Sequence, residues 1–404
     1  MRELKTAIAE SYQNHPAFRF DKPSWDLPNS HFEKFNKRYE ALRQIGGALK
    51  TSSFLELRRD CFNELDSVFA LLQSQSSDEY EKQFLVELKS ECVRLVAEEL
   101  SWYSRPRVTR FVTLDGGDVW EDALRMETDR HFFGSLPASA VAELQDISSS
   151  ELKKFRSNAA VGKLKRDDLS TNTGAVARAI RAVLNREFRK LGVLDVMSAY
   201  TGRKIRVRGV SLELSVPTAT WWRNAIPCLA RAPHTLYAHL DESISCPKSI
   251  VYLSNVTEQN GPTQCYLHGY ERMLLNPLQE IIGRVVGIVG GNADSPLKNY
   301  YSKQYHQSAN SENFRRHFMR LPAELRFNSH MGWDVMPDSL LEQEMLKCER
   351  KMVGPAGTFV AFDGARLLHR GGLMEQGERV ALQVIFSDLT VAERAIGKIK
   401  RMVS

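Results

Sequence analysis

The feature that most constrains the fold is a change in the spacing of apolar residues near residue 200. From about residue 31 to residue 200 the spacing is that of amphipathic helices, and it is clearest from Thr173 to Leu191, where Gly192 follows as a stop. After residue 200 the apolar residues recur in short runs with the period of β-strands. The sequence therefore predicts a mainly helical N-terminal half and a β-rich C-terminal half.

The β-rich half contains several short predicted strands. In the first, from Ile205 to Val216, the alternation slips by one residue at Gly209, where a β-bulge is natural. Further strands are predicted at residues 249–256, 262–268, 358–363 and 380–387, each bounded by Gly, Pro, Asn or Asp. Several short strands in sequence are typical of a sandwich or a barrel.

An insertion, from about residue 268 to residue 354, interrupts these strands. Residues 276–289 are amphipathic, and Ser339 begins a capping-box pattern that predicts a helix through Cys348. The chain has 404 residues, enough for one large domain with an accessory region or for two modest domains. We expect an α+β protein in which residues 1–200 form a mainly helical accessory region packing on a core formed by residues 201–404.

Composition excludes several classes of function. The hydrophobic fraction of 43% and the charged fraction of 26% are ordinary for a soluble globular protein. A net charge of +6 is a weak excess that does not predict nucleic-acid binding, and no stretch approaches the ~20 apolar residues of a membrane span. The six cysteines form no Cys-x-x-Cys pair, which argues against disulfides or structural zinc and favours the cytoplasm.

The strongest chemical signal is His239-Leu240-Asp241, which places an imidazole and a carboxylate two residues apart. In an extended segment this spacing points both side chains to the same face, so two metal ligands could converge there. A His-x-Asp alone occurs by chance in many chains. A third ligand on a distant strand would complete a two-histidine, one-carboxylate facial triad, which leaves positions on iron(II) open.

His369 is the predicted third ligand. It follows the predicted strand at residues 358–363 and opens the segment His369-Arg370-Gly371-Gly372. Arg379 comes ten residues later, at the start of the next predicted strand. Its guanidinium could pair with the C5 carboxylate of 2-oxoglutarate, while the C1 carboxylate and C2 ketone chelate the metal. The combination predicts a site for Fe(II), 2-oxoglutarate and O2.

Three weaker features have open interpretations. Trp221 and Trp222 could form an apolar wall for a substrate, although tryptophans more often fill core or rim positions. Arg370 could pair with an anionic substrate or with Asp363. Any of four further histidines could touch a substrate, although a lone histidine is more often structural: His234, His268, His306 and His330.

These motifs resemble the phytanoyl-CoA dioxygenase family of iron(II)- and 2-oxoglutarate-dependent oxygenases, over about Ile205 to Asp388. The resemblance rests on the His239-Leu240-Asp241 pair and Arg379, together with three further segments: Asn260-Gly261-Pro262-Thr263, Gly357-Thr358 and His369-Arg370-Gly371-Gly372. It implies a double-stranded β-helix of the jelly-roll type, with the iron ligands and the co-substrate arginine at these positions. Ala238 stands where the family often has tryptophan, and the loop at Tyr266 to Tyr270 departs from the family's turn, so the resemblance implies a different substrate pocket.

The resemblance implies hydroxylation of a small-molecule or biosynthetic intermediate, with oxidative decarboxylation of 2-oxoglutarate to succinate. Retention of Asp241 argues against halogenation, because halogenases of the family replace that carboxylate. Desaturation, epimerisation and ring formation stay open, since they use the same iron set. A homodimer is possible, because the helical half offers apolar surface.

Two alternatives use the same residues differently. The first is a non-catalytic, cupin-like jelly-roll protein that binds a ligand or partner. Arg379 argues against it, because such a scaffold needs no cation at that spacing. The second keeps the metal and makes the helical half a module that recognises a protein substrate.

Overall fold

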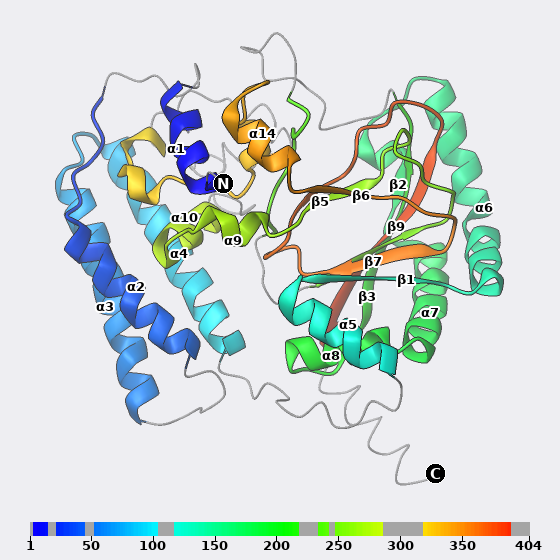
Figure 1. Cartoon of the computed structure of the whole chain (residues 1–404), viewed down its shortest axis with the longest axis horizontal. Helices are drawn as coiled ribbons and strands as arrows, with labels where there is room; N and C mark the ends of the chain where they lie inside the picture. The colour runs from blue at the N-terminus through cyan, green and yellow to red at the C-terminus, as the bar shows by residue number, and fades with distance from the viewer. Residues whose placement is uncertain are drawn as a thin grey trace.

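Helices and two antiparallel β-sheets make up the part of the chain that the computed structural model describes, residues 3–14, 22–44, 52–103, 117–217, 233–241, 247–285 and 318–388 (Figure 1). The helices are α1 (Leu4–Asn14), α2 (Asn29–Gln44), α3 (Ser52–Ser74), α4 (Glu79–Tyr103), α5 (Gly117–Thr128), α6 (Ala138–Ala160), η2 (Arg166–Asp168), α7 (Gly174–Lys190), α8 (Val193–Thr201), α9 (Gly269–Met273), α10 (Pro277–Val285), η3 (Ala323–Leu325), η4 (Met331–Trp333) and α14 (Leu340–Leu346). The strands are β1 (His131–Ser135), β2 (Ser170–Thr171), β3 (Ile205–Ser215), β4 (Lys248–Tyr252), β5 (Thr263–Tyr266), β6 (Glu349–Met352), β7 (Thr358–Phe362), β8 (Leu368–Arg370) and β9 (Arg379–Asp388). This mixture agrees with the predicted α+β class.

The larger sheet has six strands in the order β1-β7-β4-β9-β3-β2, and the smaller one has three in the order β6-β5-β8. The long β3 and β9 pair along almost their whole length, with a register shift between Val207 and Gly209. The bulge predicted at Gly209 is therefore confirmed. A strand of period two turns alternate side chains to opposite faces, so each strand of the large sheet serves two environments.

One face of the large sheet forms an apolar core with α5, α6, α7 and α8 (Figure 1). Alternate residues of β9 enter this core, beginning with Val380 and Leu382. The opposite face of the sheet carries Arg379 and Gln383, which line a cavity instead. The alternation along β9 thus separates a packed core from a polar wall.

A second core joins the N-terminal helices to the insertion. Helices α1, α2, α3 and α4 share one apolar cluster with α9, α10 and α14, at the left of Figure 1. Helices α5 to α8 pack on the sheet, so the helices before residue 201 divide between two cores. The domain boundary at residue 200 stays a prediction.

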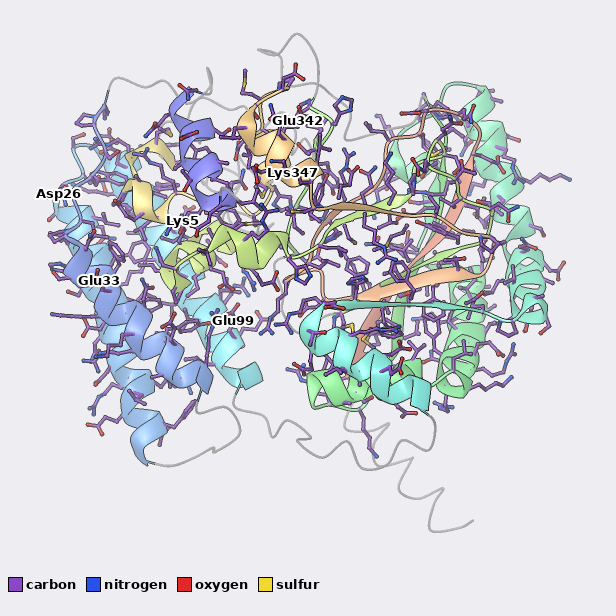
Figure 2. All side chains as sticks on the ribbon, viewed as in Figure 1. Lys5, Asp26, Glu33, Glu99, Glu342 and Lys347 are labelled. Atoms are coloured by element: carbon purple, nitrogen blue, oxygen red, sulfur yellow. The ribbon has the colours of Figure 1, made fainter. Side chains whose placement is uncertain are left out.

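A buried ion network crosses from the N-terminal helices to the sheet region. Arg284 of α10 is fully buried, and its guanidinium lies 3.0 Å from Glu99 of α4 and 2.9 Å from Glu280. Glu99 lies on the side of α4 that faces the sheets (Figure 2). Arg284 also donates to the backbone oxygen of Ala365 at 2.8 Å, in the turn between β7 and β8. The network therefore ties the helical region to that turn.

Most predicted elements are present. The helix expected from Thr173 is α7, and the helix expected from Ser339 is α14, which ends at Leu346. The Ser339 hydroxyl caps it by accepting a hydrogen bond from the backbone N–H of Glu342, but the Glu342 carboxylate accepts from the backbone N–H of Asp338, so only half of the predicted capping box is observed. The short strands β1, β2, β6 and β8 were not predicted. Cys61, Cys92, Cys265 and Cys348 are buried free thiols, whereas Cys228 and Cys246 lie outside the described residues. Within the described ranges, every helix is too short or too polar to cross a membrane.

Candidate metal and co-substrate site

Backbone pairing brings His239, Asp241 and His369 together. His369 lies on β8, and it exchanges two backbone hydrogen bonds with His239, of 2.9 and 3.0 Å. Asp241 donates its backbone N–H to Gly364 at 2.8 Å. The segment around His239 thus extends the small sheet beyond β8, and one ligand-type atom from each of the three side chains lies within 4.8 Å of the others. The predicted convergence of these residues is observed.

Both imidazoles are oriented by backbone carbonyls. The Nδ1 atom of His239 lies 2.9 Å from the oxygen of Tyr237, and that of His369 lies 2.8 Å from the oxygen of Leu367. A carbonyl only accepts, so each Nδ1 carries the proton and each Nε2 keeps its lone pair. The two Nε2 atoms lie 3.7 and 3.8 Å from Oδ1 of Asp241. Nε2 of His369 is buried with no hydrogen-bond partner among the described residues.

Burial keeps these imidazoles neutral. It is the main cause that lowers the pKa of His239 to about 3 and that of His369 to about 4, with further lowering by nearby positive charge. Burial by itself raises the pKa of Asp241, but the charge of Lys248 and its hydrogen bond to the carboxylate act in the opposite direction, and that pKa lies below its ordinary value. Neutral imidazoles and an ionised carboxylate are the protonation states that metal coordination requires.

Lys248, the first residue of β4, was not singled out from the sequence. Its side chain is buried, and its Nζ lies 2.7 Å from Oδ2 and 2.9 Å from Oδ1 of Asp241. His330, which the sequence analysis had named, also adjoins the site, since its ring stacks on His239 with centroids 5.2 Å apart and planes 6° from parallel. The sequence interpretation of His330 as a possible neighbour of the substrate is compatible with its place in the cavity wall.

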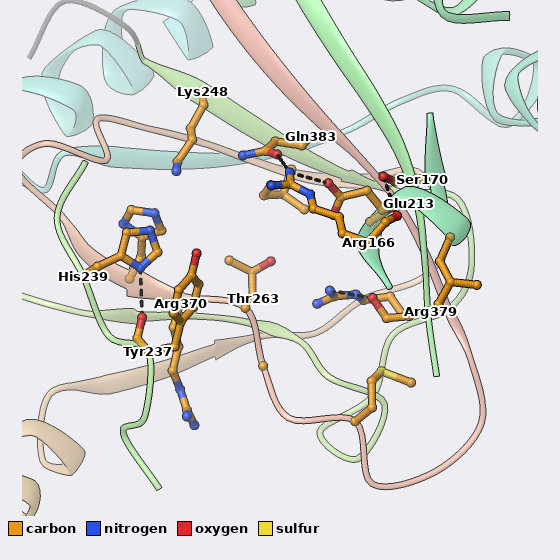
Figure 3. Close-up of a pocket in the computed structure, with 18 of the residues that line it drawn as sticks. Arg166, Ser170, Glu213, Tyr237, His239, Lys248, Thr263, Arg370, Arg379 and Gln383 are labelled. Atoms are coloured by element: carbon orange, nitrogen blue, oxygen red, sulfur yellow. Dashed lines mark hydrogen bonds and ion pairs between the residues drawn. The ribbon is translucent and has the colours of Figure 1, made fainter. Parts of the chain in front are cut away.

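Arg379 lines the same cavity as the three metal-ligand candidates, on the side away from His239 (Figure 3). Its pairing with Ser215 across β3 and β9 places Nη2 3.1 Å from the serine hydroxyl, and Nη1 donates to the oxygen of Gly261. Its Nε is buried without a hydrogen-bond partner among the described residues. Thr263, on β5, lies between Arg379 and His239 in the view of Figure 3. These groups form a polar end to the cavity.

The cavity has a volume of about 300 Å³, at the lower end of the range for small-molecule sites. Its wall on the large sheet includes Gln383 and Glu213, which Arg166 of η2 bridges at 3.4 and 3.3 Å. Leu164, Leu169 and other apolar residues complete the lining. The cavity therefore suits a small, polar ligand.

Close packing in the turn between β7 and β8 also shapes the site. A Cβ atom on Gly364 would lie 1.9 Å from Oδ2 of Asp241 and 3.0 Å from the ring of His369. Tyr200 of α8 donates to the carboxylate of Asp363 at 2.5 Å, and burial raises the pKa of Asp363. Only a glycine at position 364 lets the backbone approach the ligand candidates so closely.

Of the open interpretations of the sequence, one is narrowed by the structure and one is not tested. Arg370 is buried and does not pair with Asp363; it donates to the side chain of Gln264 and to the oxygen of Leu236, and lies 3.7 Å from Glu349. Trp221 and Trp222 lie outside the described residues.

Comparisons with known proteins identify no family. No family model and no curated protein matches the sequence. Solved structures overlap only loosely with this chain. EctD from S. alaskensis has a TM-score of 0.38 and 13% identity, over 70% of this chain and 81% of its own. The epimerase SnoN from nogalamycin biosynthesis has a TM-score of 0.33 and 12% identity, over 68% of this chain and 84% of its own; AviO1 from Streptomyces viridochromogenes Tue57 has a TM-score of 0.36 and 13% identity, over 69% of this chain and 96% of its own. Overlaps at this level do not place the chain in a family, so its chemistry rests on the geometry of the site.

Proposed function

We propose that this chain is an iron(II)- and 2-oxoglutarate-dependent oxygenase. One observation carries the proposal: two neutral imidazoles and a carboxylate converge to within 4.8 Å in a cavity that also contains a buried arginine. The donor set fits iron(II), because a two-histidine, one-carboxylate triad leaves coordination positions for further ligands. The partnerless Nε2 of His369 fits too, since a buried nitrogen with a lone pair normally has a partner.

His239, Asp241 and His369 would hold the metal, and Arg379 would hold the C5 carboxylate of 2-oxoglutarate. When bound, iron(II) with 2-oxoglutarate and O2 supplies the oxidising power for attack on a C–H bond, with succinate and carbon dioxide as products. The backbone carbonyls of Tyr237 and Leu367 fix the tautomer and ring orientation of the two imidazoles.

Arg379 acts as the anchor for the co-substrate in this proposal. A buried guanidinium forms strong, directional hydrogen bonds with a carboxylate, and Ser215 keeps it aimed at the cavity. The serine hydroxyl and that of Thr263 can donate further hydrogen bonds at the same end. Hydroxylation of a small molecule is the default outcome, and the substrate's position relative to the metal decides between it and desaturation, epimerisation or ring formation.

The finer statements of fold and family belong to the same proposal. We propose that the two sheets form a double-stranded β-helix of the jelly-roll type, and that the chain is similar in function to the phytanoyl-CoA dioxygenase family. The cytoplasmic location and a homodimer stay predictions from the sequence.

The test is anaerobic addition of iron(II) and then 2-oxoglutarate to the purified protein, followed by visible spectroscopy. A charge-transfer band that requires both additions is expected. Arg379→Ala removes hydrogen bonds to a charged group, and should weaken 2-oxoglutarate binding roughly ten- to a hundredfold. Arg156→Ala, which removes an exposed arginine paired with Glu378, is the matched control and should leave the titration unchanged.

Asp241→Ala should abolish both the band and succinate formation. Near-normal succinate formation by this variant would contradict the assignment of the ligands. Absence of the band in folded, metal-loaded wild-type protein would favour the non-catalytic jelly-roll alternative.

A further inference from the structure

The proposed function leaves the buried cation Lys248 without a role. Lys248 is 7% exposed, and its ammonium lies against Asp241 and 5.4 Å from the centre of the Phe362 ring. Figure 3 shows its side chain reaching into the cavity from the large sheet, on the opposite side from Arg379. A buried lysine is costly unless its charge is compensated, so its position near a metal site requires an explanation.

The charges around the cavity do not balance without a further anion. Among the described residues, the cavity is lined by four basic and two acidic side chains. Arg166 pairs with Glu213, and Arg370 lies 3.7 Å from Glu349, which does not line the cavity. Lys248 and Arg379 are left with Asp241 as the one carboxylate.

Bound metal and co-substrate would leave this excess in place. Iron(II) brings two positive charges and 2-oxoglutarate brings two negative ones, so the pair adds no net charge. Asp241 would share its carboxylate between the metal and Lys248, which weakens the present ion pair. One positive charge then stays uncompensated in a mostly buried site, a situation that favours an anionic ligand.

The wall beside Lys248 indicates where such a ligand would lie. Ile250 pairs with Gln383 across β4 and β9, so Gln383 lies on the strand adjacent to β4 and faces the same cavity. Arg166, whose side chain is 51% exposed, bonds Gln383 and marks the solvent side of this wall. In the strand register, Gln383 and the Arg166–Glu213 pair thus lie along the cavity wall between Lys248 and Arg379.

We propose that Lys248 binds an anionic group, such as a carboxylate, of the primary substrate, and so determines specificity for a small anionic molecule. This inference rests on the proposed function. The C1 carboxylate of 2-oxoglutarate is the rival source of negative charge, but the metal itself would neutralise it. The remainder of the substrate would extend along the wall formed by Gln383 and the Arg166–Glu213 pair.

The experiment uses the full chain loaded with Mn²⁺ and saturating 2-oxoglutarate, with acetate as the probe anion and acetamide as its neutral counterpart. Paramagnetic relaxation of the probe's methyl protons reports binding near the metal without any turnover. Manganese affinity and 2-oxoglutarate affinity are measured first on the same samples by calorimetry. If neither ligand binds the wild-type protein, the proposed function fails, and this inference fails with it.

We expect acetate to be relaxed more strongly than acetamide by the wild-type complex. Lys248→Met keeps the length of the side chain without its charge, and should weaken acetate binding roughly tenfold or more, as loss of a hydrogen bond to a charged group does. Lys248→Arg should retain part of the preference for acetate. Lys154→Met, at a lysine whose side chain is 66% exposed, is the control for loss of one positive charge and should behave as wild type.

Three results would overturn the inference while leaving the proposed function intact. The first is equal relaxation of acetate and acetamide by the wild-type complex. The second is an undiminished preference for acetate in Lys248→Met that still binds Mn²⁺ and 2-oxoglutarate. The third is acetate binding that appears only when 2-oxoglutarate is left out, because the anion would then occupy the co-substrate's own position.

Discussion

Gly364→Ala offers the sharpest test of how the turn between β7 and β8 supports the metal-ligand candidates. The added methyl would lie 1.9 Å from Oδ2 of Asp241, whereas ordinary contacts of this kind are 3.4–4 Å. To restore an ordinary contact of 3.4 Å, the carboxylate would have to move by about 1.5 Å, which is 3.4 Å minus 1.9 Å. Such a shift takes Asp241 out of the cluster with His239 and His369.

The substitution separates metal binding from stability. Gly364 does not have a positive φ, so alanine suffers no backbone strain there, and overpacking should lower the free energy of unfolding by about 1–3 kcal/mol. Loss of a contact that only orients a metal ligand typically weakens metal affinity roughly 10- to 100-fold. Gly364→Ala displaces the ligand Asp241 itself, so it should weaken metal affinity by more than this. Calorimetric titration with Mn²⁺, alongside thermal unfolding, measures both effects.

Gly209→Ala is the matched control for adding a methyl group. Its Cβ would meet the side chain of Ile385 at 3.3 Å, in the bulge of β3 and outside the cavity that contains the triad. We expect its metal affinity to equal that of the wild type. If Gly364→Ala also bound Mn²⁺ with wild-type affinity, Asp241 would not be a ligand held in this position, and the assignment of the site would be refuted.

Two further predictions concern buried charges. Arg284→Met leaves Glu99 buried without its main partner and should lower the free energy of unfolding, measured in urea, by about 3–5 kcal/mol. The control Arg94→Met, at an exposed arginine, should change that free energy by less than about 0.5 kcal/mol. Equal effects of the two substitutions would contradict the role of the network. Burial raises the pKa of Glu81, but the backbone N–H of Ser77 and nearby cations outweigh it and lower that pKa. The ionised Glu81 therefore contributes its full stabilisation above the ordinary carboxyl pKa, and this stabilisation is lost as the pH falls through the lowered pKa. The difference in the free energy of unfolding between wild type and Glu81→Gln should be largest at neutral pH and should shrink in acid. A difference that does not depend on pH would exclude this explanation.

Long elements with one buried face were predictable from the sequence. The β3 strand has 11 residues, and its apolar residues alternate on both sides of one slip at Gly209. The slip is visible because a one-residue shift reverses which side chains face the core. Helix α7 was predictable for the same reason, since its apolar stripe repeats over several turns. In such elements the local pattern and the tertiary environment impose the same period.

The short strands of the small sheet were not predictable in this way. β8 has 3 residues and consists of Leu368, His369 and Arg370, which is too short for an alternation to be recognised and too polar to indicate a strand. Its strand character comes from pairing with β5 and with His239, partners more than 100 residues away in the sequence. The proximity of His369 to His239 was inferred from chemistry, not from the strand pattern.

Lys248 shows why part of the site was missed. A lysine at the first position of a strand normally points to solvent, so nothing in the sequence marks it as buried. Its place between β7 and β9, where it pairs with Phe362 and Ile385, turns the side chain into the cavity. Gly364 was missed for a related reason, because a close approach of backbone to a side chain depends on the tertiary structure alone.

The turn that carries Gly364 is where the two cores of the protein meet. From the sheet side, Tyr200 of α8 holds Asp363; from the helical side, Arg284 holds the oxygen of Ala365 and is itself held by Glu99 of α4. A turn fixed from both sides keeps its backbone close to Asp241 with little freedom to move, which is the condition for a preorganised metal site. The helices α1 to α4 therefore contribute to the geometry of the site through α4, although none of their described side chains lines the cavity.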